Sequence, residues 1–375
     1  MSICLNMIVK NESKTLPKLF ESLHEVIDYY VILDTGSDDG TPDLIKSTMK
    51  KYNIEGEVFH SEWVNFAVCR NRALKHAINK ADYALIIDAD ESLHYLDKNF
   101  FTNLTEDCYF FKRKYSNIEY YLPALLNISE NNKLEWKWEG PVHNFLTNAP
   151  KHNITKEYVD IDKVWIKSTV HGGSKSHNVT PSEKYLRDAQ ILEEELKKNP
   201  NDARSQYYLA QSYKDAGENE KAILHYKKRV EMKGWEEEVY YSLYSIGLCK
   251  QRMGCDFESE VLHDYLRAFT YRSTRLEALY EILFYYRNTK ADPQKAFGYG
   301  MLANALVFPT DKLFVDTGIH RYKFLDELSI AAYQIGFYLF SYKLMKKILE
   351  EKHYPDNEHK RLSDNFKFAT DKLLE

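Results

Sequence analysis

The spacing of apolar and polar positions changes along the chain near residue 180. Before this point, short apolar or β-branched runs alternate with amphipathic segments, whereas a helical period dominates after it. We therefore predict an N-terminal α/β domain at residues 1–178 and an all-α domain at residues 182–375. The polar stretch at residues 171–184 joins them, and Thr180 and Glu183, with a proline between them, predict a helix start there.

Predicted strands and helices alternate in the first part of the chain. Strands are expected at residues 3–10, 29–34, 55–60 and 83–87, and helices at residues 14–26, from Thr41-Pro42 onward, and at residues 66–81. Such alternation predicts a mainly parallel sheet, because right-handed crossovers place the helices on its faces. Ligands bind such sheets at the carboxyl ends of the strands.

Acidic residues follow three of these predicted strands. They are Glu12 after the first, Asp34, Asp38 and Asp39 after the second, and Asp88, Asp90 and Glu91 after the fourth. In a parallel sheet these acids converge, and converging carboxylates repel unless they hold a cation or hydrogen-bond donors. A hard divalent ion with open positions for phosphate oxygens fits this ligand type. The alternative for an isolated Asp-x-Asp is a solvated turn or a helix N-cap.

The overall charge and the cysteines narrow the class of protein. A net charge of −5 gives no general attraction to nucleic acid or to an anionic membrane. The five cysteines form no CxxC pair and are odd in number, which is typical of reduced thiols. Because no apolar run approaches the length of a membrane span, we expect no transmembrane segment and a soluble, cytoplasmic protein.

Four segments resemble, in order, the motifs of family 2 nucleotide-sugar glycosyltransferases of the GT-A fold. They are MIVKNE, VILDTGSDDGT, WVNFAVCRNRAL and YALIIDADE. The likeness covers roughly residues 3–230 and is greatest to members with a tetratricopeptide-repeat (TPR) helical domain behind a short catalytic domain. It implies an α/β GT-A domain with a Rossmann-like mixed sheet, followed by an all-α TPR-like domain.

The resemblance implies a donor site for a nucleotide-diphosphate sugar, with a UDP-sugar as the expected donor. Asn11 and Glu12 would line the nucleoside pocket, and Asp34 would accept a hydrogen bond from the base or the ribose. Arg70 would meet the nucleotide, with Asn71 shaping the same loop. The alternative for Arg70 is a solvated cation on a helix.

The same resemblance implies a metal site for Mn²⁺ or Mg²⁺. Asp88 and Asp90 would form the DxD motif, with Asp90 the more direct ligand. His143 and His171 compete as the third protein ligand. We predict His171, because the closing segment of a GT-A domain commonly returns to the metal face, and His143 would then line the acceptor side. Hydrogen-bonded structural histidines are the alternative.

One motif departs from the family pattern. In GPVHN, Asn144 stands where the family commonly has glutamate, and an amide cannot serve as a general base. The candidates for the general base in its place are Glu139, Glu91 or a group of the acceptor. His143 is a further candidate on the acceptor side. Four nearby aromatic residues are candidates for stacking on sugars, with core packing as the alternative: Tyr120, Tyr121, Trp136 and Trp138.

The second half of the chain has the pattern of helical repeats. In NDARSQYYLAQSYKDAGENEKAILHYKKRV, large and small residues occupy the positions that interlock two helices of a TPR unit: Leu209, Ala210, Tyr213, Gly217, Ala222 and Tyr226. Less regular helical segments follow, so we expect a short superhelix of degenerate repeats. Its concave surface could hold an acceptor protein or glycan, and a homodimer contact is left open.

Two functions follow from these patterns. The first is an inverting, metal-dependent glycosyltransferase acting on a nucleotide-diphosphate sugar. The second is a TPR interaction scaffold whose transferase domain is weakly active or inactive, an alternative that Asn144 keeps open. The presence of Asp34, Arg70, Asp88 and Asp90 favours the enzyme.

Overall fold

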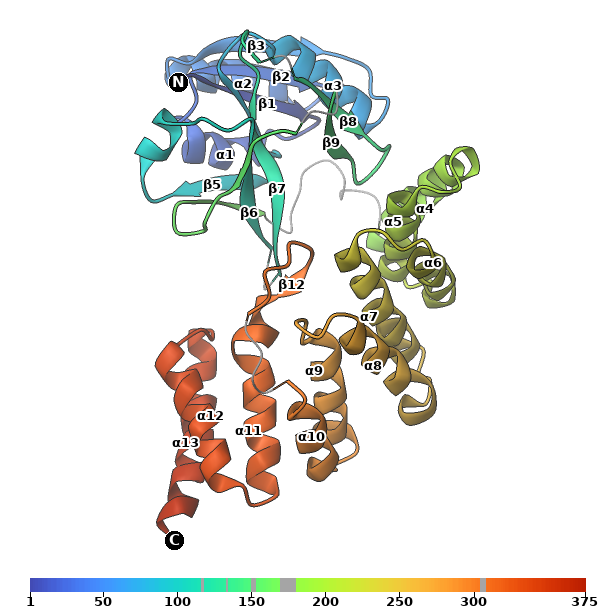
Figure 1. Cartoon of the computed structure of the whole chain (residues 1–375). Helices are drawn as coiled ribbons and strands as arrows, with labels where there is room; N and C mark the ends of the chain where they lie inside the picture. The colour runs from blue at the N-terminus through green and yellow to red at the C-terminus, as the bar shows by residue number, and fades with distance from the viewer. Residues whose placement is uncertain (116–117, 133, 150–152, 169–179, 304–307) are drawn as a thin grey trace. The chain divides into compact units, whose positions relative to one another are not determined.

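The computed structural model describes the chain except for residues 116–117, 133, 150–152, 169–179 and 304–307 (Figure 1). The chain divides into two compact units, Met1–Ala216 and Gly217–Glu375. The predicted domain boundary begins within residues 169–179, outside the described part, and it stays a prediction.

The first unit contains a sheet, flanking helices and one helical hairpin. Its strands are β1 (Ile3–Val9), β2 (Tyr29–Asp34), β3 (Glu55–His60), β4 (Tyr83–Ile86), β5 (Glu91–Tyr95), β6 (Cys108–Tyr115), β7 (Ile118–Asn127), β8 (Glu135–Glu139), β9 (Phe145–Ala149), β10 (Lys156–Tyr158) and β11 (Val164–Ser168). Its helices are α1 (Leu16–Leu23), α2 (Thr41–Lys51), α3 (Phe66–Ala77), the 3₁₀-helix η1 (Lys98–Thr102), α4 (Pro181–Lys198) and α5 (Ala203–Ala216). The elements predicted up to residue 87 are confirmed, with some helix ends shorter than expected.

The sheet is parallel where the sequence predicted it and mixed beyond. Neighbouring strands follow the order β3-β2-β1-β4-β7-β6-β11-β5, with β10 beside β6. Pairing among β3, β2, β1 and β4 is parallel, and β7 joins both β4 and β6 antiparallel. Strands β8 and β9 form a separate ribbon, labelled in Figure 1. The expected mixed α/β sheet is thus confirmed.

Alternation along β1 explains how both faces of the sheet are covered. Leu5 and Met7 are buried in the cluster that includes the apolar residues of α1 and α2. Cys4 belongs instead to the cluster that includes Ala67 and Leu74 of α3. Successive side chains of a strand point to opposite faces, so a strand buried on both sides reads as one continuous apolar run. This buried frame fixes the loops at the strand ends.

Helix α4 begins as the sequence predicted. The Thr180 hydroxyl accepts a hydrogen bond from the Glu183 amide at 3.3 Å, and the Glu183 carboxylate accepts one from the Thr180 amide at 2.8 Å. This reciprocal arrangement satisfies two amides that the helix cannot pair internally.

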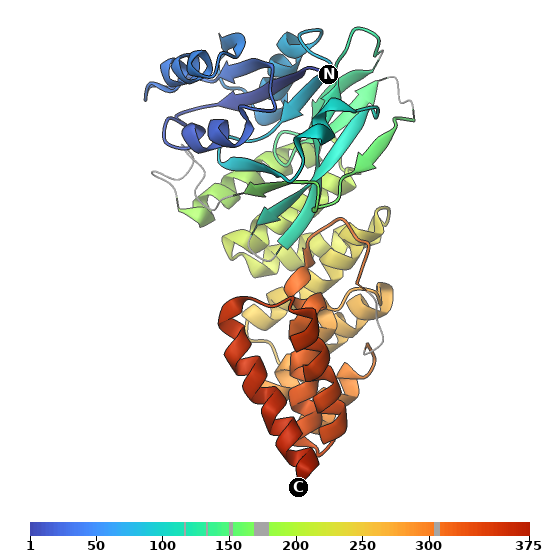
Figure 2. The same cartoon turned by 90° about the vertical axis from the view of Figure 1, so that its left-hand side faces the viewer.

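The second unit is helical, and its elements are α6 (Asn219–Glu231), α7 (Glu236–Arg252), η2 (Phe257–Val261), α8 (Leu262–Tyr271), α9 (Glu277–Phe284), η3 (Tyr285–Thr289), α10 (Pro293–Gly300), β12 (Val315–Asp316), η4 (Ile319–Lys323), α11 (Phe324–Gln334), α12 (Tyr338–Glu351), η5 (Asp356–Glu358) and α13 (His359–Leu374). From α6 to α13, each α-helix packs on the next along the chain; the red helices α12 and α13 lie side by side in Figures 1 and 2. The large and small residues named above as repeat positions are buried, except for Gly217. The predicted helical region is confirmed, whereas the two-residue strand β12 departs from the all-α prediction.

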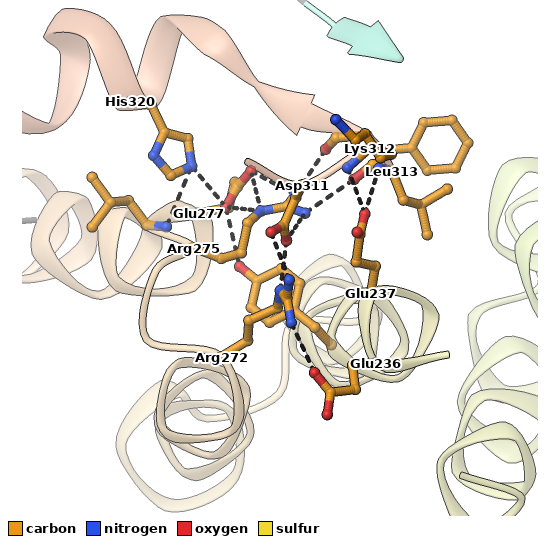
Figure 3. A network of polar contacts seen from close by, with 12 residues as sticks. Glu236, Glu237, Arg272, Arg275, Glu277, Asp311, Lys312, Leu313 and His320 are labelled. Atoms are coloured by element: carbon orange, nitrogen blue, oxygen red, sulfur yellow. Dashed lines mark hydrogen bonds and ion pairs between the residues drawn. The ribbon is translucent and has the colours of Figure 1, made fainter. Parts of the chain in front are cut away.

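A buried network of charges organises this second unit (Figure 3). The fully buried Arg275 donates to Glu277 at 2.7 Å and to Asp311 at 3.3 Å. It also donates to the backbone carbonyls of Leu313 and Phe314, at 3.0 and 2.9 Å. The backbone at residues 313 and 314 is therefore held by a buried side chain.

Two further features answer expectations from the sequence. All five cysteines are free thiols, and only Cys255 is more than slightly exposed. Across the described ranges, no helix combines the length and apolar character needed to cross a bilayer.

Candidate functional site

The acids predicted to converge do lie at one edge of the sheet. In the parallel register Val9 pairs with Asp34, so the residues after β1 follow directly beside the end of β2. Asn6 pairs with Ile86, which brings the end of β4 to the other side of β1. Glu12, Asp34 and Asp88 thus leave three adjacent strands at their carboxyl ends, where open α/β sheets bind ligands.

Hydrogen bonds join the loop after β1 to the loop after β2. The Asn11 amide donates to the Ser37 hydroxyl at 2.9 Å, and the Asp38 amide donates to Oδ1 of Asn11 at 2.9 Å. The Glu12 amide donates to the Thr41 hydroxyl at 2.9 Å. Asn11 has φ of 56°, a left-handed conformation that asparagine tolerates better than most residues. Asn11 therefore links the two loops through its backbone and its side chain.

Asp39 strengthens the same connection. Its carboxylate accepts hydrogen bonds from the Ser13 amide at 3.1 Å and from the Thr41 hydroxyl at 2.6 Å. Burial acts to raise the pKa of Asp39, but the hydrogen bonds from Ser13 and Thr41 outweigh it and lower the pKa to about 2. Asp39 is therefore ionised at neutral pH and holds the two loops together.

Asp34 lies at the base of this edge and is 2% exposed. Its carboxylate accepts from the amides of Gly36 and Ser37, each at 3.2 Å to Oδ2, and from the Ser37 hydroxyl. Nδ1 of His60 lies 3.2 Å from the same Oδ2. Asp34 thus orders the turn after β2, and most of its acceptor capacity is used within the protein.

Arg70 and Asp88 form an ion pair at the acidic edge of the sheet. Nη2 of Arg70 donates to Oδ1 of Asp88 at 2.6 Å, and the two side chains are 18% and 53% exposed. The guanidinium also lies over the Trp138 ring, 4.9 Å from its centroid. Arg70 is therefore a partly covered cation beside the acidic edge, not a solvated helix cation.

Asn71 and two of the candidate aromatic residues have structural contacts. The Asn71 side chain accepts from the Trp138 amide at 2.7 Å and donates to the Trp138 carbonyl at 2.9 Å, which fixes β8 against α3. Trp138 is 5% exposed and belongs to the core, and Trp136 donates through its indole nitrogen to the Asn127 carbonyl at 2.8 Å. Packing, the alternative to sugar stacking, accounts for both tryptophans.

Asp90 is a carboxyl group at this edge whose pKa is raised. Burial raises its pKa to about 6, and the neighbouring charges of Asp88, Glu91 and Glu12 add to the effect. This accumulation of negative charge suits a divalent cation with oxygen ligands. Among the residues that the structure describes, no three His, Cys, Asp or Glu side chains are grouped to hold a metal ion. His171, the predicted third ligand, lies outside the described residues.

Glu91 differs from its acidic neighbours because it is buried and paired. It is 7% exposed and lies 3.3 Å from Nε of Arg113, which is 4% exposed. Arg113 was not singled out from the sequence. The available signal was its position in β6, where strand alternation places it on the same buried face as Tyr109 and Phe111.

The acceptor-side candidates lie on and after β8. Glu139 ends β8, is 42% exposed at its side chain and lies 3.4 Å from Nζ of Lys137. The exposed His143 stacks its ring on Tyr208 of α5, with centroids 4.2 Å apart. Within the described part of the chain, the side-chain nitrogen of Asn144 is buried without a hydrogen-bond partner. Glu139 is thus the more accessible carboxylate of the two candidate bases.

Comparison with known proteins agrees with this geometry. Residues 4–109 match the model of glycosyl transferase family 2. The SPbeta prophage-derived glycosyltransferase SunS of Bacillus subtilis is 25% identical over 238 residues, which span 61% of this chain and 53% of SunS. A TPR repeat-containing protein of Synechococcus elongatus is 35% identical over 94 residues, 25% of this chain and 21% of that protein. The chain thus spans about half of one relative and about a fifth of the other.

Several solved structures align with part of this chain. The MamA protein aligns with a TM-score of 0.34 and 19% identity over 45% of this chain and 83% of its own. YrrB, described as a TPR protein with an unusual peptide-binding site, aligns with a TM-score of 0.32 and 10% identity over 51% of this chain and 84% of its own. From its motifs, its sheet and the family match, the chain carries a family 2 glycosyltransferase domain in its N-terminal part, followed by a helical region.

Proposed function

We propose that this protein is a metal-dependent, inverting glycosyltransferase that transfers a sugar from a nucleotide-diphosphate donor, expected to be a UDP-sugar. The observation that carries the proposal is the convergence of the acidic ends of β1, β2 and β4 at one edge, within the segment that matches the family model. Open α/β sheets bind their ligands at such an edge.

In this proposal the nucleoside is bound by the loops after β1 and β2, which hydrogen bonds join to each other. Asn11 and Glu12 line the pocket, and their backbone is fixed by Ser37 and Thr41 before any ligand arrives. Asp34 orders the turn beneath the base and offers its remaining acceptor capacity to the base or ribose. Rigid loops lower the entropic cost of binding, so these hydrogen bonds between the loops favour affinity for the donor.

Asp88 and Asp90, with His171 as the third candidate, would hold Mn²⁺ or Mg²⁺. The cation would neutralise charge on the diphosphate leaving group. Arg70 adds a second positive charge at the same edge, because its guanidinium already reaches Asp88. Phosphate oxygens that meet this guanidinium would receive charge-assisted hydrogen bonds.

On the acceptor side, we propose that Glu139 takes the proton of the acceptor nucleophile. The nucleophile forms a bond to the anomeric carbon while the bond from that carbon to the diphosphate oxygen breaks, and this oxygen keeps the electron pair. Glu139 suits the role because its carboxylate is 42% exposed, whereas Glu91 is held in a buried ion pair. His143 would contact the acceptor.

The partners of the proposal are a nucleotide sugar and an acceptor protein or glycan held by the helical region. The name of SunS gives it as a glycosyltransferase, which agrees with this reaction class. The free thiols suit a reducing compartment, so we extend the proposal to a cytoplasmic location. The homodimer contact left open by the sequence stays a prediction, and the mass of the protein in solution tests it.

The second candidate is a scaffold whose transferase domain binds nucleotide weakly. Asn144 favours it, because an amide at this place cannot accept a proton. The two functions differ in turnover. Incubation with a panel of nucleotide sugars and Mn²⁺ or Mg²⁺, scored for donor hydrolysis or transfer, should release a nucleoside diphosphate if the protein is an enzyme. Absence of turnover across the panel, together with no shift in Tm from UDP and Mn²⁺, would favour the scaffold.

A further inference from the structure

A buried arginine connects four strands directly beneath the acidic edge. Arg113 of β6 donates through Nε to Oε1 of Glu91 at 3.3 Å. It also donates through Nη1 to the Leu122 carbonyl of β7 at 3.2 Å, and through Nη2 to the Ile86 carbonyl at the end of β4 at 3.3 Å. In Figure 1 the strands β5, β6 and β7 lie in the same part of the sheet. One side chain thus fixes the last residue of β4 and the first residue of β5.

The Glu91 carboxylate, which Arg113 holds, in turn fixes the backbone of the Asp88–Asp90 segment. Its Oε2 accepts the Asp88 amide at 3.0 Å, and its Oε1 accepts the Ser168 hydroxyl at 2.7 Å. The Glu91 amide donates back to the Asp88 carbonyl at 3.1 Å. Hydrogen bonds therefore fix the short connection from β4 to β5 at both of its ends. Asp90 lies between Asp88 and Glu91, which bond to each other.

Charge and burial explain why an arginine is needed at this place. Glu91 would otherwise be a buried anion close to Asp88 and Asp90, and an unpaired buried charge is strongly unfavourable. Arginine can pair with the carboxylate and serve two carbonyls at once, because its guanidinium presents donors in several fixed directions. A lysine in the same place would keep the charge and lose most of these directed bonds.

We propose that Arg113 is a positioning residue, which acts through Glu91 to fix the backbone that carries Asp88 and Asp90. The inference rests on the proposed function, because those two aspartates are the proposed cation and donor ligands. It assigns Glu91 a positioning role in place of the role of base. Neither residue touches the reacting atoms in this scheme.

A double-mutant cycle tests the connection between the two residues. We choose Arg113→Met, which removes every donor at similar length, and Glu91→Gln, which keeps the shape and removes the charge. Binding of UDP in the presence of Mn²⁺ is measured by calorimetry for the wild type, both single variants and the double variant. Each single variant should weaken binding at least about tenfold, the range found for residues that orient metal ligands.

If Arg113 acts through Glu91, the double variant should bind UDP at least as tightly as the single variant with the lower affinity. The reason is that the effects of substituting two contacting residues of one network do not add. Fully additive losses, or unchanged affinity in Arg113→Met, would overturn the proposal. Lys112→Met is the matched control, since Lys112 neighbours Arg113 on β6 and points to the other face of the sheet. It should bind like the wild type.

Hydrogen exchange without ligand separates this inference from the proposed function. In Arg113→Met, the peptide spanning residues 85–92 should exchange faster while β1 keeps its protection. The substitution removes the bonds to the Ile86 carbonyl and to Glu91, which in turn holds the Asp88 amide. Unchanged exchange would refute the positioning role whatever UDP does. Faster exchange in a protein whose wild type binds no UDP would refute the UDP donor and leave the positioning role standing. Should Arg113→Met fail to fold, Arg113→Lys takes its place.

Discussion

The ring of His143 stacks on the ring of Tyr208, with centroids 4.2 Å apart and planes 9° from parallel. Arg204, also on α5, lies over the rings of Phe145 and Tyr208, 4.8 Å from each centroid, and donates to the His143 carbonyl at 3.4 Å. His143 has φ of 48°, a conformation that costs energy for a non-glycine residue. The first helical hairpin therefore holds the loop that the sequence assigns to the acceptor side.

This contact predicts a separation between binding and turnover. Tyr208→Ala should leave the affinity for UDP with Mn²⁺ within about twofold and lower donor turnover at least about tenfold, because a displaced loop loses the alignment of reacting groups. Tyr208→Phe keeps the ring and should behave like the wild type. The measurements are calorimetry and the turnover of whichever nucleotide sugar proves active. Equal losses of affinity and turnover would instead assign Tyr208 to general stability.

The metal ligands can be distinguished by substitution. Asp90→Asn keeps the shape and removes the charge, so it should cost at least about 2–3 kcal/mol of transition-state stabilisation. His171→Ala should weaken Mn²⁺ binding in titrations, whereas His143→Ala should disturb acceptor use, because its ring is engaged on α5. Asp162→Asn is the control, because this exposed carboxylate lies on the turn before β11, and only the opposite end of β11, at Ser168, pairs with Glu91. A large loss of Mn²⁺ affinity in His143→Ala, with none in His171→Ala, would reverse the assignment.

The early part of the fold could be predicted because its signals are local. Residues 29–34 read as a strand from their apolar run alone, and the proline after Thr41 indicates a helix start. Asp34, Asp88 and Asp90 could be grouped because parallel strands align their carboxyl ends. Local patterns and one rule of topology were sufficient for these elements.

The remainder depends on contacts that no local pattern contains. The ladder of β6 with β7 and β11 alternates direction, and Arg113 is recognisable as a partner of Glu91 only once that pairing is known. The stack of His143 on Tyr208 joins residues 65 positions apart. Such pairings are set by tertiary packing and override local propensity.

The contact between His143 and Tyr208 predicts where the chain can be divided into stable fragments. A fragment of residues 1–178 contains His143 without Tyr208, whereas a fragment of residues 1–216 contains both and matches the first compact unit. We expect the longer fragment to have the higher Tm, because the 140–145 loop keeps its aromatic contacts. Equal Tm values for the two fragments would support the boundary near residue 178, as would a resistant fragment of that size in limited proteolysis of the whole chain.

The buried charges of the second unit predict a large loss of stability. Burial opposes ionisation of Glu277, but the Arg275 charge holds the pKa of that carboxyl well below its usual range. Arg275→Met leaves Glu277 and Asp311 short of their cation and should lower the free energy of unfolding by about 3–5 kcal/mol. Lys295→Met, which breaks an exposed pair with Glu258, should cost less than about 1 kcal/mol. Urea unfolding of both variants measures the difference, and equal losses would contradict the prediction.

A pH-dependent penalty comes from Glu281 on α9. Burial raises the pKa of this carboxyl, a hydrogen bond from Tyr244 lowers it, and the charge of Asp316 raises it again, to about 7. The folded protein therefore binds a proton more tightly than the unfolded chain does. As pH rises from about 4.5 to 7, the unfolded chain ionises Glu281 first, so the free energy of unfolding falls.

Glu281→Gln removes this contribution because the amide is neutral at every pH. The stability of the variant relative to the wild type should therefore increase between pH 5 and pH 8, by up to about 3 kcal/mol. Urea unfolding at several pH values measures it, with Glu260→Gln as the control, since that exposed side chain is solvated in both states. A difference that stays constant from pH 5 to pH 8 would mean that Glu281 is already ionised in the folded protein. Charges such as Arg252 and Lys323 would then outweigh the burial of its carboxyl.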